Sequence, residues 1–301
     1  MLSELKVKRN KIVDSNGNEV VLRGININSP DILKYEEHHD FLEDIKNIKK
    51  LGANAIRVPI CPAYFQYKSD YCEDILDPIV ELCKKLKLYC LLDYHGQGNP
   101  IKGLTREPKM LINGFKKYDA EYGAMKKAAY ILAKRYGNQD HVLFEPISAY
   151  FLEITQKEYQ TISKELAQII REHSDNIIII SAVGWPQTLE FALNYKVNIL
   201  NVAFGTMIYS GTTNELRKII AKVKEHYPIV VTECGYENIN PKDVILAGTI
   251  DYAISLKSFL EEKKLSFFAW CYHPTRHPVI IRSWDPKDLS EWGKFVKEEM
   301  L

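Results

Sequence analysis

One glutamate stands in the sequence context of a catalytic carboxylate. Glu233 ends an apolar run, Pro228-Ile-Val-Val-Thr-Glu233-Cys-Gly235, and this pattern predicts a buried β-strand with an acid at its C-terminal end. In barrels of parallel strands, reactive groups lie where the strands finish. A glutamate placed there after a β-branched run is more typical of chemistry than of structure. We therefore put Glu233 at the centre of a candidate active site.

Four other side chains at the ends of predicted strands suit a carboxylate that attacks a sugar. Each closes a different strand, so in a barrel all would face the same mouth as Glu233: Arg57, His95, Tyr209 and Trp270. A guanidinium and a phenol beside a carboxylate keep it ionised and oriented, as a nucleophile requires. A tryptophan offers a flat apolar face to a sugar ring. Together these side chains predict a carbohydrate site.

The segments that must position these residues follow a repeating pattern. Short β-branched or aromatic runs alternate with amphipathic segments, which is typical of βα units and a parallel sheet. The predicted strands are 20–26, 54–60, 88–95, 141–148, 176–183, 199–209, 229–233 and 266–272. The predicted helices include 41–51, 72–86, 118–136, 157–173, 214–226 and 251–263. This pattern predicts a (β/α)8 TIM barrel, and because no Gly-, Pro- or Ser-rich linker divides residues 1–301, we expect one domain.

The N-terminal segment predicts a small element of its own. Residues 5–22 alternate polar and apolar side chains around Asp14-Ser-Asn-Gly17, the pattern of a β-hairpin, which we expect to cap the barrel floor. A doubly wound open sheet is the alternative fold. That fold requires a phosphate-binding glycine turn after its first strand, and Arg23-Gly-Ile-Asn lacks one.

Composition argues against several classes of partner. A formal net charge of +1, with Lys and Glu intermixed, gives no broad basic face for nucleic acid. No run of about 18 apolar residues predicts a membrane span, and the start lacks the apolar segment of a secretory signal. We expect a soluble protein, cytoplasmic as the sequence stands, or secreted if a leader has been removed. The oligomeric state is not predicted.

Cysteine usage and glycine motifs predict neither a metal nor a cofactor. The six cysteines have irregular spacing and form no CxxC pair, so they fit neither a disulfide scaffold nor a zinc site. Reduced thiols in the core are the simpler interpretation. No glycine loop of the kind that cradles phosphate is present either.

Taken in order along the chain, these motifs resemble glycoside hydrolase family 5, the cellulase and mannanase family of retaining barrel enzymes. The resemblance covers nearly the whole chain and rests on five segments: 10–26, Gly52-Ala-Asn-Ala-Ile-Arg-Val-Pro59, Leu92-Asp-Tyr-His95, 228–235 and Phe268-Ala-Trp270. It implies a β-glucan, a β-mannan or a related glycoside as the partner. It also implies roles for individual residues: Glu233 as nucleophile, Arg57 and Tyr209 as its hydrogen-bonding partners, His95 as a polar wall and Trp270 as the sugar platform. Asn26, Ser148 and Trp185 complete the expected substrate-binding set.

Two strands depart from the family pattern. The fourth strand of the family ends in Asn-Glu-Pro, whose glutamate is the general acid and base, but here Ser148, Ala149 and Tyr150 occupy those positions. The sixth strand carries Met207 where the family has a histidine. Since a retaining glycosidase uses two carboxylates about 5–5.5 Å apart, and acid-base assistance contributes roughly 10²–10⁴ in rate, ordinary hydrolysis is expected to be impaired or altered.

Glu145 is the nearest substitute in sequence for the missing acid. Four residues separate it from Ala149, so in a continuous strand it faces the same side but lies roughly 13 Å deeper. We therefore expect a buried glutamate at the barrel floor that pairs with a basic group, and a substitute acid only if the strand slides or kinks at Pro146.

Three functions remain open from the sequence. The leading one is a divergent glycoside hydrolase with Glu233 as nucleophile. The second is a noncatalytic carbohydrate-binding protein or scaffold that has kept the barrel and lost the chemistry. The third is a barrel enzyme with a new reaction that uses Glu233 as a general base beside Cys61 or His95.

Overall fold

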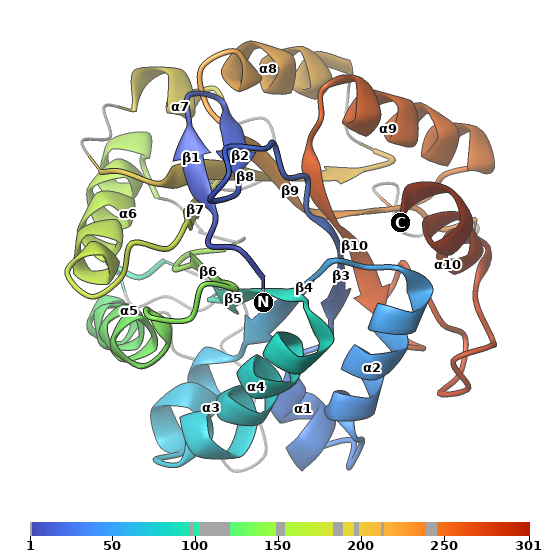
Figure 1. The fold of residues 1–301 in the computed structure, drawn as a ribbon, viewed down its shortest axis with the longest axis horizontal. Helices are drawn as coiled ribbons and strands as arrows, with labels where there is room; N and C mark the ends of the chain where they lie inside the picture. The colour runs from blue at the N-terminus through green and yellow to red at the C-terminus, as the bar shows by residue number, and fades with distance from the viewer. Residues whose placement is uncertain are drawn as a thin grey trace.

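The computed structural model has a closed barrel of parallel strands at its centre (Figure 1). It describes residues 2–96, 99–102, 121–148, 154–182, 189–195, 199–211, 214–238 and 246–301. Around the barrel the strands follow the order β10-β3-β4-β5-β6-β7-β8-β9, and each described pair of neighbours is parallel. Their bounds are β3 (Arg23–Ile27), β4 (Ala55–Ile60), β5 (Tyr89–Tyr94), β6 (Val142–Glu145), β7 (Ile178–Ser181), β8 (Val202–Tyr209), β9 (Ile229–Gly235) and β10 (Ser266–Tyr272). The predicted TIM barrel is confirmed.

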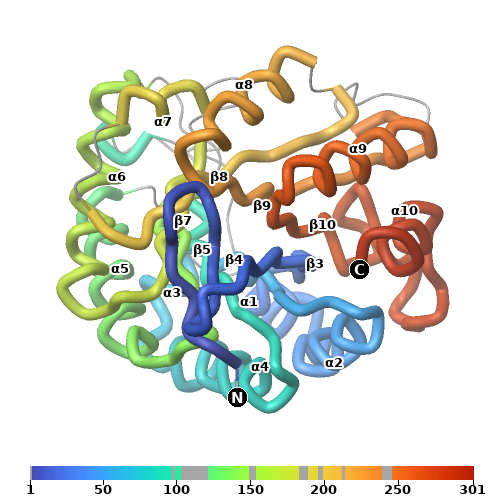
Figure 2. Tube along the Cα trace, turned by 45° about the horizontal axis from the view of Figure 1, so that its top comes forward, coloured from blue at the N-terminus to red at the C-terminus, as the bar shows by residue number. Residues whose placement is uncertain are grey.

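Helices surround the barrel on its outer face (Figures 1 and 2). They are α1 (Pro30–Tyr35), α2 (Phe41–Leu51), α3 (Pro62–Tyr67), α4 (Asp77–Leu86), α5 (Tyr122–Tyr136), α6 (Gln156–Arg171), α7 (Phe191–Asn194), α8 (Asn214–Lys224), α9 (Ile250–Glu262) and α10 (Glu291–Phe295). Single π-helical turns precede α4 and follow α10, at Cys72–Leu76 and Val296–Met300. None of the helices in the described ranges is both long and apolar enough to cross a membrane.

Local sequence signals explain where several helices begin and end. Asp40 caps α2 by accepting a hydrogen bond from the Leu42 amide, and Gly52 ends the helix in the left-handed conformation at φ 116°. Thr155 and Glu158 form a capping box at the start of α6. Such caps satisfy backbone groups that a helix terminus otherwise leaves without partners.

Two separate cores follow from the alternation of side chains along the strands. Residues on the outer face, such as Ile56, Val58 and Leu92, pack with the helices in one large cluster. Residues on the inner face, such as Leu91 and Phe268, fill the lower part of the barrel in a second cluster. The barrel interior is therefore packed below the mouth, and polar groups are concentrated at the strand ends.

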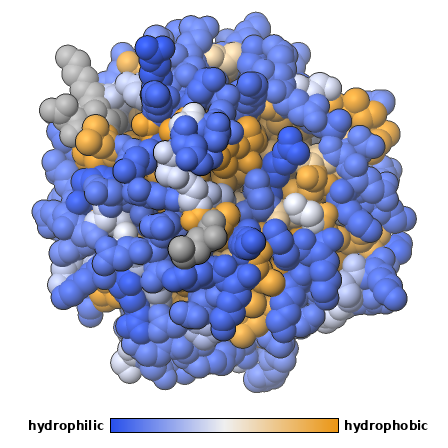
Figure 3. Space-filling view, viewed as in Figure 1, coloured by the Kyte–Doolittle hydropathy of each residue, from blue (hydrophilic) through white to orange (hydrophobic). Residues whose placement is uncertain are grey.

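The N-terminal hairpin covers the floor of the barrel, as predicted. Strands β1 (Lys6–Lys8) and β2 (Lys11–Val13) pair antiparallel and lie across the end of the barrel that faces the viewer in Figure 1. Leu5 and Ile12 belong to the inner cluster. The side-chain oxygen of Asn201, just before β8, accepts from the Val7 amide at 3.0 Å and helps to hold the hairpin in place. The face seen in Figure 3 is mainly hydrophilic, with scattered hydrophobic side chains.

The fourth barrel strand is about half as long in the structure as the sequence indicated. The prediction extended the fourth barrel strand over 141–148, but β6 spans only Val142–Glu145. Pro146 has no amide hydrogen to continue the ladder, so the strand ends directly before it. Residues 146–148, which the prediction included in the strand, lie outside the sheet. Glu145 is therefore the last residue of its strand.

Candidate active site

A β-bulge in β9 turns Glu233 into the barrel. Val230 belongs to the inner cluster, so strict alternation would place residue 232 inside and Glu233 outside, among the helices. The register shifts instead: Thr206 pairs with Val231 and Met207 pairs with Glu233, so β9 has one extra residue. The neighbour β10 shows the same shift between Phe267 and Ala269. The extra residue restores an inward direction for the carboxylate.

Two donors hold the Glu233 carboxylate at the mouth. Arg57 Nη1 donates to Oε1 at 2.9 Å, and the Tyr209 hydroxyl donates to Oε2 at 2.8 Å. Burial and the nearby Glu233 charge keep the pKa of Tyr209 well above its usual value, so the phenol retains the proton that it donates. The Glu233 side chain is 8% exposed. One carboxylate oxygen therefore faces the guanidinium and the other faces the phenol, next to a small open surface.

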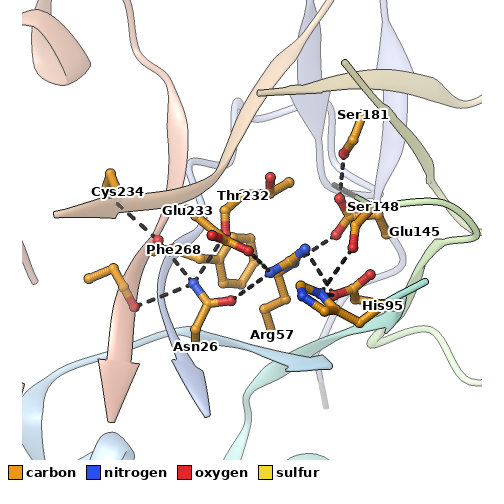
Figure 4. Close-up of polar contacts among 12 residues, drawn as sticks. Asn26, Arg57, His95, Glu145, Ser148, Ser181, Thr232, Glu233, Cys234 and Phe268 are labelled. Atoms are coloured by element: carbon orange, nitrogen blue, oxygen red, sulfur yellow. Dashed lines mark hydrogen bonds and ion pairs between the residues drawn. The ribbon is translucent and has the colours of Figure 1, made fainter. Parts of the chain in front are cut away.

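Arg57 is the centre of a buried charge network (Figure 4). Its side chain is fully buried and lies within 2.9 Å of three carboxylates, namely Asp93 at 2.9 Å, Glu145 at 2.7 Å and Glu233 at 2.9 Å. Burial opposes the charge of Arg57, but the three acids outweigh it and raise its pKa. One cation is thus paired with three acids. Ionising all three at once would leave uncompensated negative charge in a buried environment, which is energetically costly.

The two fully buried carboxyls of this network differ in protonation. Burial raises the pKa of Glu145 to about 7, against the opposing effects of Arg57 and the Ser181 hydroxyl. Burial also acts on Asp93, but Arg57 and His95 outweigh it and hold the pKa of Asp93 below its usual value. Asp93 is therefore the ionised partner of Arg57, and Glu145 is the acid that takes a proton near neutral pH.

His95 joins the network from the end of β5. Its Nδ1 lies 2.7 Å from Asp93 Oδ2 and 3.1 Å from Ser148 Oγ. Burial would lower the pKa of His95, but Asp93 outweighs it and raises that pKa. Serine, histidine and aspartate are adjacent here without forming a nucleophilic triad, because a triad places its serine and its carboxylate on different ring nitrogens.

Two residues expected to bind substrate lie instead inside the protein. Asn26 is fully buried: its side-chain amide donates to the carbonyls of Thr232 and Phe268, and its side-chain oxygen accepts from Arg57 at 2.9 Å. Ser148 is also fully buried and contacts His95. Direct contact of either residue with a sugar stays a prediction, which their burial here does not favour. They orient Arg57 and His95.

Of the remaining expected residues, the structure describes Trp270 and Met207. Trp270 is half-buried at the end of β10, and its carbonyl accepts from Trp292 Nε1 at 2.8 Å. Met207 is half-buried beside Glu233 on the neighbouring strand. Ala149, Tyr150 and Trp185 lie outside the described residues.

The structure corrects the expected depth of Glu145. Its pairing with a basic group is confirmed by the 2.7 Å contact from Arg57 Nε. The floor position is wrong, because β6 ends at Glu145 and the side chain lies at the C-terminal end of its strand, paired with Asp93. Both carboxyl oxygens are engaged, by Arg57 and by the Ser181 hydroxyl, and the side chain is fully buried. Glu145 is therefore closed to direct contact with a substrate.

Cys61 does not have the properties of a reactive thiol. It is buried, and burial together with Asp31 raises its pKa, so the sulfur stays protonated. Cys234 packs in the large outer cluster with the helices. Within the described ranges, no group of three or more His, Cys, Asp or Glu side chains is arranged to hold a metal ion.

Sequence reasoning missed Asp93 and Ser181. Asp93 precedes His95 by two residues, and side chains two apart in a strand lie on the same face. The sequence could therefore have predicted that Asp93 faces the barrel interior with His95. Ser181 gave no comparable signal, since a serine after an isoleucine run is common in buried strands. Its role depends on Glu145, which comes from another strand.

Comparison with known proteins shows the family of this chain. The family model for cellulase (glycosyl hydrolase family 5) matches residues 13–276, so the chain belongs to that family. An endoglucanase from Clostridium saccharobutylicum is 23% identical over 310 residues, covering 99% of this chain and 65% of the relative. Endoglucanase A from Butyrivibrio fibrisolvens is 22% identical over 245 residues, covering 77% of this chain and 52% of the relative. The chain thus spans less than two thirds of the length of these curated relatives.

A solved structure shows the same fold. The native β-glucanase SdGluc5_26A from Saccharophagus degradans matches with a TM-score of 0.89 and 21% identity, over 100% of this chain and 93% of that one. The same β-glucanase has also been solved in complex with cellotetraose.

Proposed function

We propose that the chain is a divergent glycoside hydrolase that acts on a β-linked glycan or glycoside with Glu233 as its nucleophile. The observation that carries this proposal is the Glu233 carboxylate, held by Arg57 and Tyr209 at the mouth of a family 5 barrel. A carboxylate with two donors on its oxygens is ionised and fixed in direction, as attack on an anomeric carbon requires. Trp270 is the proposed sugar platform.

A β-glucan or β-mannan is the proposed class of substrate. The curated relatives are endoglucanases, and a structural neighbour has been solved with cellotetraose. Hydrolysis is proposed to be slower than in a typical retaining enzyme, because Ala149 occupies the position of the acid and Glu145 is fully buried with both oxygens engaged. The resulting loss is at most the roughly 10²–10⁴-fold that acid-base assistance supplies.

The test uses an activated substrate that needs no protonation of its leaving group. With 2,4-dinitrophenyl β-cellobioside or β-mannobioside, we expect release of dinitrophenolate, and in the presence of azide we expect a β-glycosyl azide. Because the product keeps the β configuration of the substrate, it would show two successive displacements at the anomeric carbon. The first forms a covalent intermediate with the enzyme, and azide opens that intermediate from the opposite face. Glu233→Ala should abolish the β-azide product.

Glu261→Ala is the matched control for this experiment. Glu261 is an exposed glutamate on α9 and lines a surface pocket with Arg23 and Phe267, residues at the start of their strands, so it lies away from the mouth. This variant should keep the full rate. No turnover of either glycoside, with or without azide, would exclude a hydrolase that uses Glu233.

A noncatalytic glycan-binding protein is the second candidate. It is favoured by the two apolar substitutions, Ala149 at the acid position and Met207 beside Glu233. It predicts that cellotetraose or a manno-oligosaccharide binds without turnover and that Trp270→Ala weakens binding. Calorimetric titration together with product analysis separates the two candidates.

A further inference from the structure

We propose that His95 delivers the proton to the leaving-group oxygen, in place of the glutamate that Ala149 replaces. This inference rests on the proposed function, since it concerns the same glycosyl transfer to Glu233. It starts from a chemical need: a sugar leaving group departs as an alcohol only if some group protonates it. Five titratable side chains surround Arg57 or join it through a neighbour, and each can be compared as the source of that proton: Asp93, His95, Glu145, Tyr209 and Glu233.

Exposure separates these groups. The side chains of Asp93 and Glu145 are fully buried, whereas those of His95 and Glu233 are 17% and 8% exposed. A general acid must come within about 3 Å of the oxygen that it protonates, so a fully enclosed carboxyl is excluded by geometry. Tyr209 donates its hydroxyl proton to Glu233, and its pKa lies well above its usual value, so it is a poor acid. Because Glu233 is the proposed nucleophile, His95 is left in this network as the group that can reach a substrate.

His95 contacts the segment that carries the acid in the family. Ser148 Oγ lies 3.1 Å from His95 Nδ1, and Ser148 is the residue directly before Ala149 in the chain. The contact thus brings a titratable ring from the end of β5 to the residues that follow β6, the strand after which the family carries its acid.

The contacts of His95 prepare it for proton transfer. Asp93 Oδ2 lies 2.7 Å from Nδ1 and is itself held by Arg57 at 2.9 Å, which fixes the ring and favours the imidazolium. The positive charge of Arg57 opposes this, while the charge of Glu233 supports it.

The reaction balances with these groups alone. Glu233 attacks the anomeric carbon, the bond from that carbon to the leaving oxygen breaks, and the oxygen takes the proton of His95 Nε2 while Nδ1 keeps its proton on Asp93. In the second half, the neutral Nε2 takes a proton from water, the water oxygen bonds to the anomeric carbon, and the bond to Glu233 breaks. The free sugar, the carboxylate and the imidazolium are restored.

The test compares two cellobiosides that differ only in their leaving group. The 2,4-dinitrophenolate group leaves without being protonated, whereas the phenolate group leaves efficiently only when an acid protonates its oxygen. His95→Asn keeps a side-chain amide that can donate to Asp93 but carries no transferable proton. We expect kcat/KM for the phenyl substrate to fall by about 10²–10⁴-fold and kcat/KM for the dinitrophenyl substrate to change only a few-fold. Glu145→Gln, which alters the same buried network, should change both substrates by the same factor.

A measurement on the wild-type protein tests the proposal even if the His95→Asn variant does not fold. In the wild type, kcat/KM for the phenyl substrate should fall as pH rises through the titration of His95, and kcat/KM for the dinitrophenyl substrate should show no such fall. Equal losses on both substrates in His95→Asn, or identical pH profiles in the wild type, would overturn the proposal, because His95 would then only position other groups. Failure of the wild type to cleave even the dinitrophenyl substrate would instead reject the proposed function.

Discussion

Arg57 shows at the scale of single residues how this mouth combines stability with chemistry. Its guanidinium binds three carboxyls that come from three other strands, and it also donates a hydrogen bond to the side-chain oxygen of Asn26. A buried cation with excess acid around it forces one acid to stay neutral. Burial raises the pKa of Glu145 to about 7 because that side chain has no access to water and shares its cation with two others.

This protonation predicts a pH-dependent stability that Glu145 controls. Its pKa rises from 4.5 to about 7 on folding, so the folded state binds the proton more tightly. The resulting stabilisation is complete below pH 4.5, is lost as pH rises through about 7, and is on the order of 3 kcal/mol. Glu145→Gln is neutral at all pH values. Its free energy of unfolding should therefore rise relative to the wild type between about pH 5 and pH 8 in urea titrations.

Ser181→Ala provides a second arm of this experiment. The Ser181 hydroxyl donates to Glu145 and lowers its pKa, so removing it should move the pH-dependent loss of stability to higher pH. A stability difference between Glu145→Gln and the wild type that is constant with pH would contradict the assignment.

At the scale of elements, strand irregularities and a glycine position the site. The bulge in β9 aims Glu233 inward, and the early end of β6 brings Glu145 to the mouth end of its strand. Gly205 on β8 leaves room for Ser181: a Cβ at that position would lie 2.2 Å from Ser181 Oγ and 3.0 Å from Ile179 Cγ2. The barrel tolerates the Ser181–Glu145 contact because its neighbour lacks a side chain.

We expect Gly205→Ala to destabilise the protein by about 1–3 kcal/mol, as overpacking does, since the new methyl group must displace Ser181 or the strand. Gly123→Ala is the matched control. A Cβ at Gly123, in the first turn of α5, would meet its nearest atom at 3.9 Å, so this change should be neutral or stabilising by up to about 1 kcal/mol. Equal midpoints of thermal unfolding for the two variants would show that the space beside Ser181 is not needed.

At the scale of the whole molecule, the barrel separates stability from chemistry along its axis. The inner cluster and the hairpin fill and cover the floor, while the charged network lies at the opposite end. The hairpin contributes Leu5, which is 3% exposed, to the inner cluster. Changes at the floor should therefore alter stability without altering the proposed chemistry. That residues 1–301 form one domain stays a prediction, which a single calorimetric unfolding transition would support.

Leu5→Ala tests this separation. Truncating a buried leucine should lower the free energy of unfolding by about 2–5 kcal/mol, and the rate on an activated glycoside should be unchanged below the unfolding temperature. Leu200→Ala, at a leucine that is 82% exposed, should change stability by about 0.5 kcal/mol or less. A loss of activity in folded Leu5→Ala would show that floor and mouth are coupled.

Local sequence patterns were enough to predict the barrel, its floor hairpin, the family and the positions where polar side chains close the strands. These depend on local patterns: alternation along strands, amphipathic helices, and motifs such as 228–235 that stay together in the chain. The pairing of Glu145 with a basic group was also within reach, because a buried glutamate requires a partner.

The contacts among the charged residues at the mouth could be seen only in the folded protein. Alternation alone would have pointed Glu233 outward, and the bulge that reverses it is visible only in the register with β8 and β10. The sharing of Arg57 among three acids is equally nonlocal, because each acid comes from a different strand. Register and shared charge are set by contacts between segments far apart in the chain, so no local pattern records them.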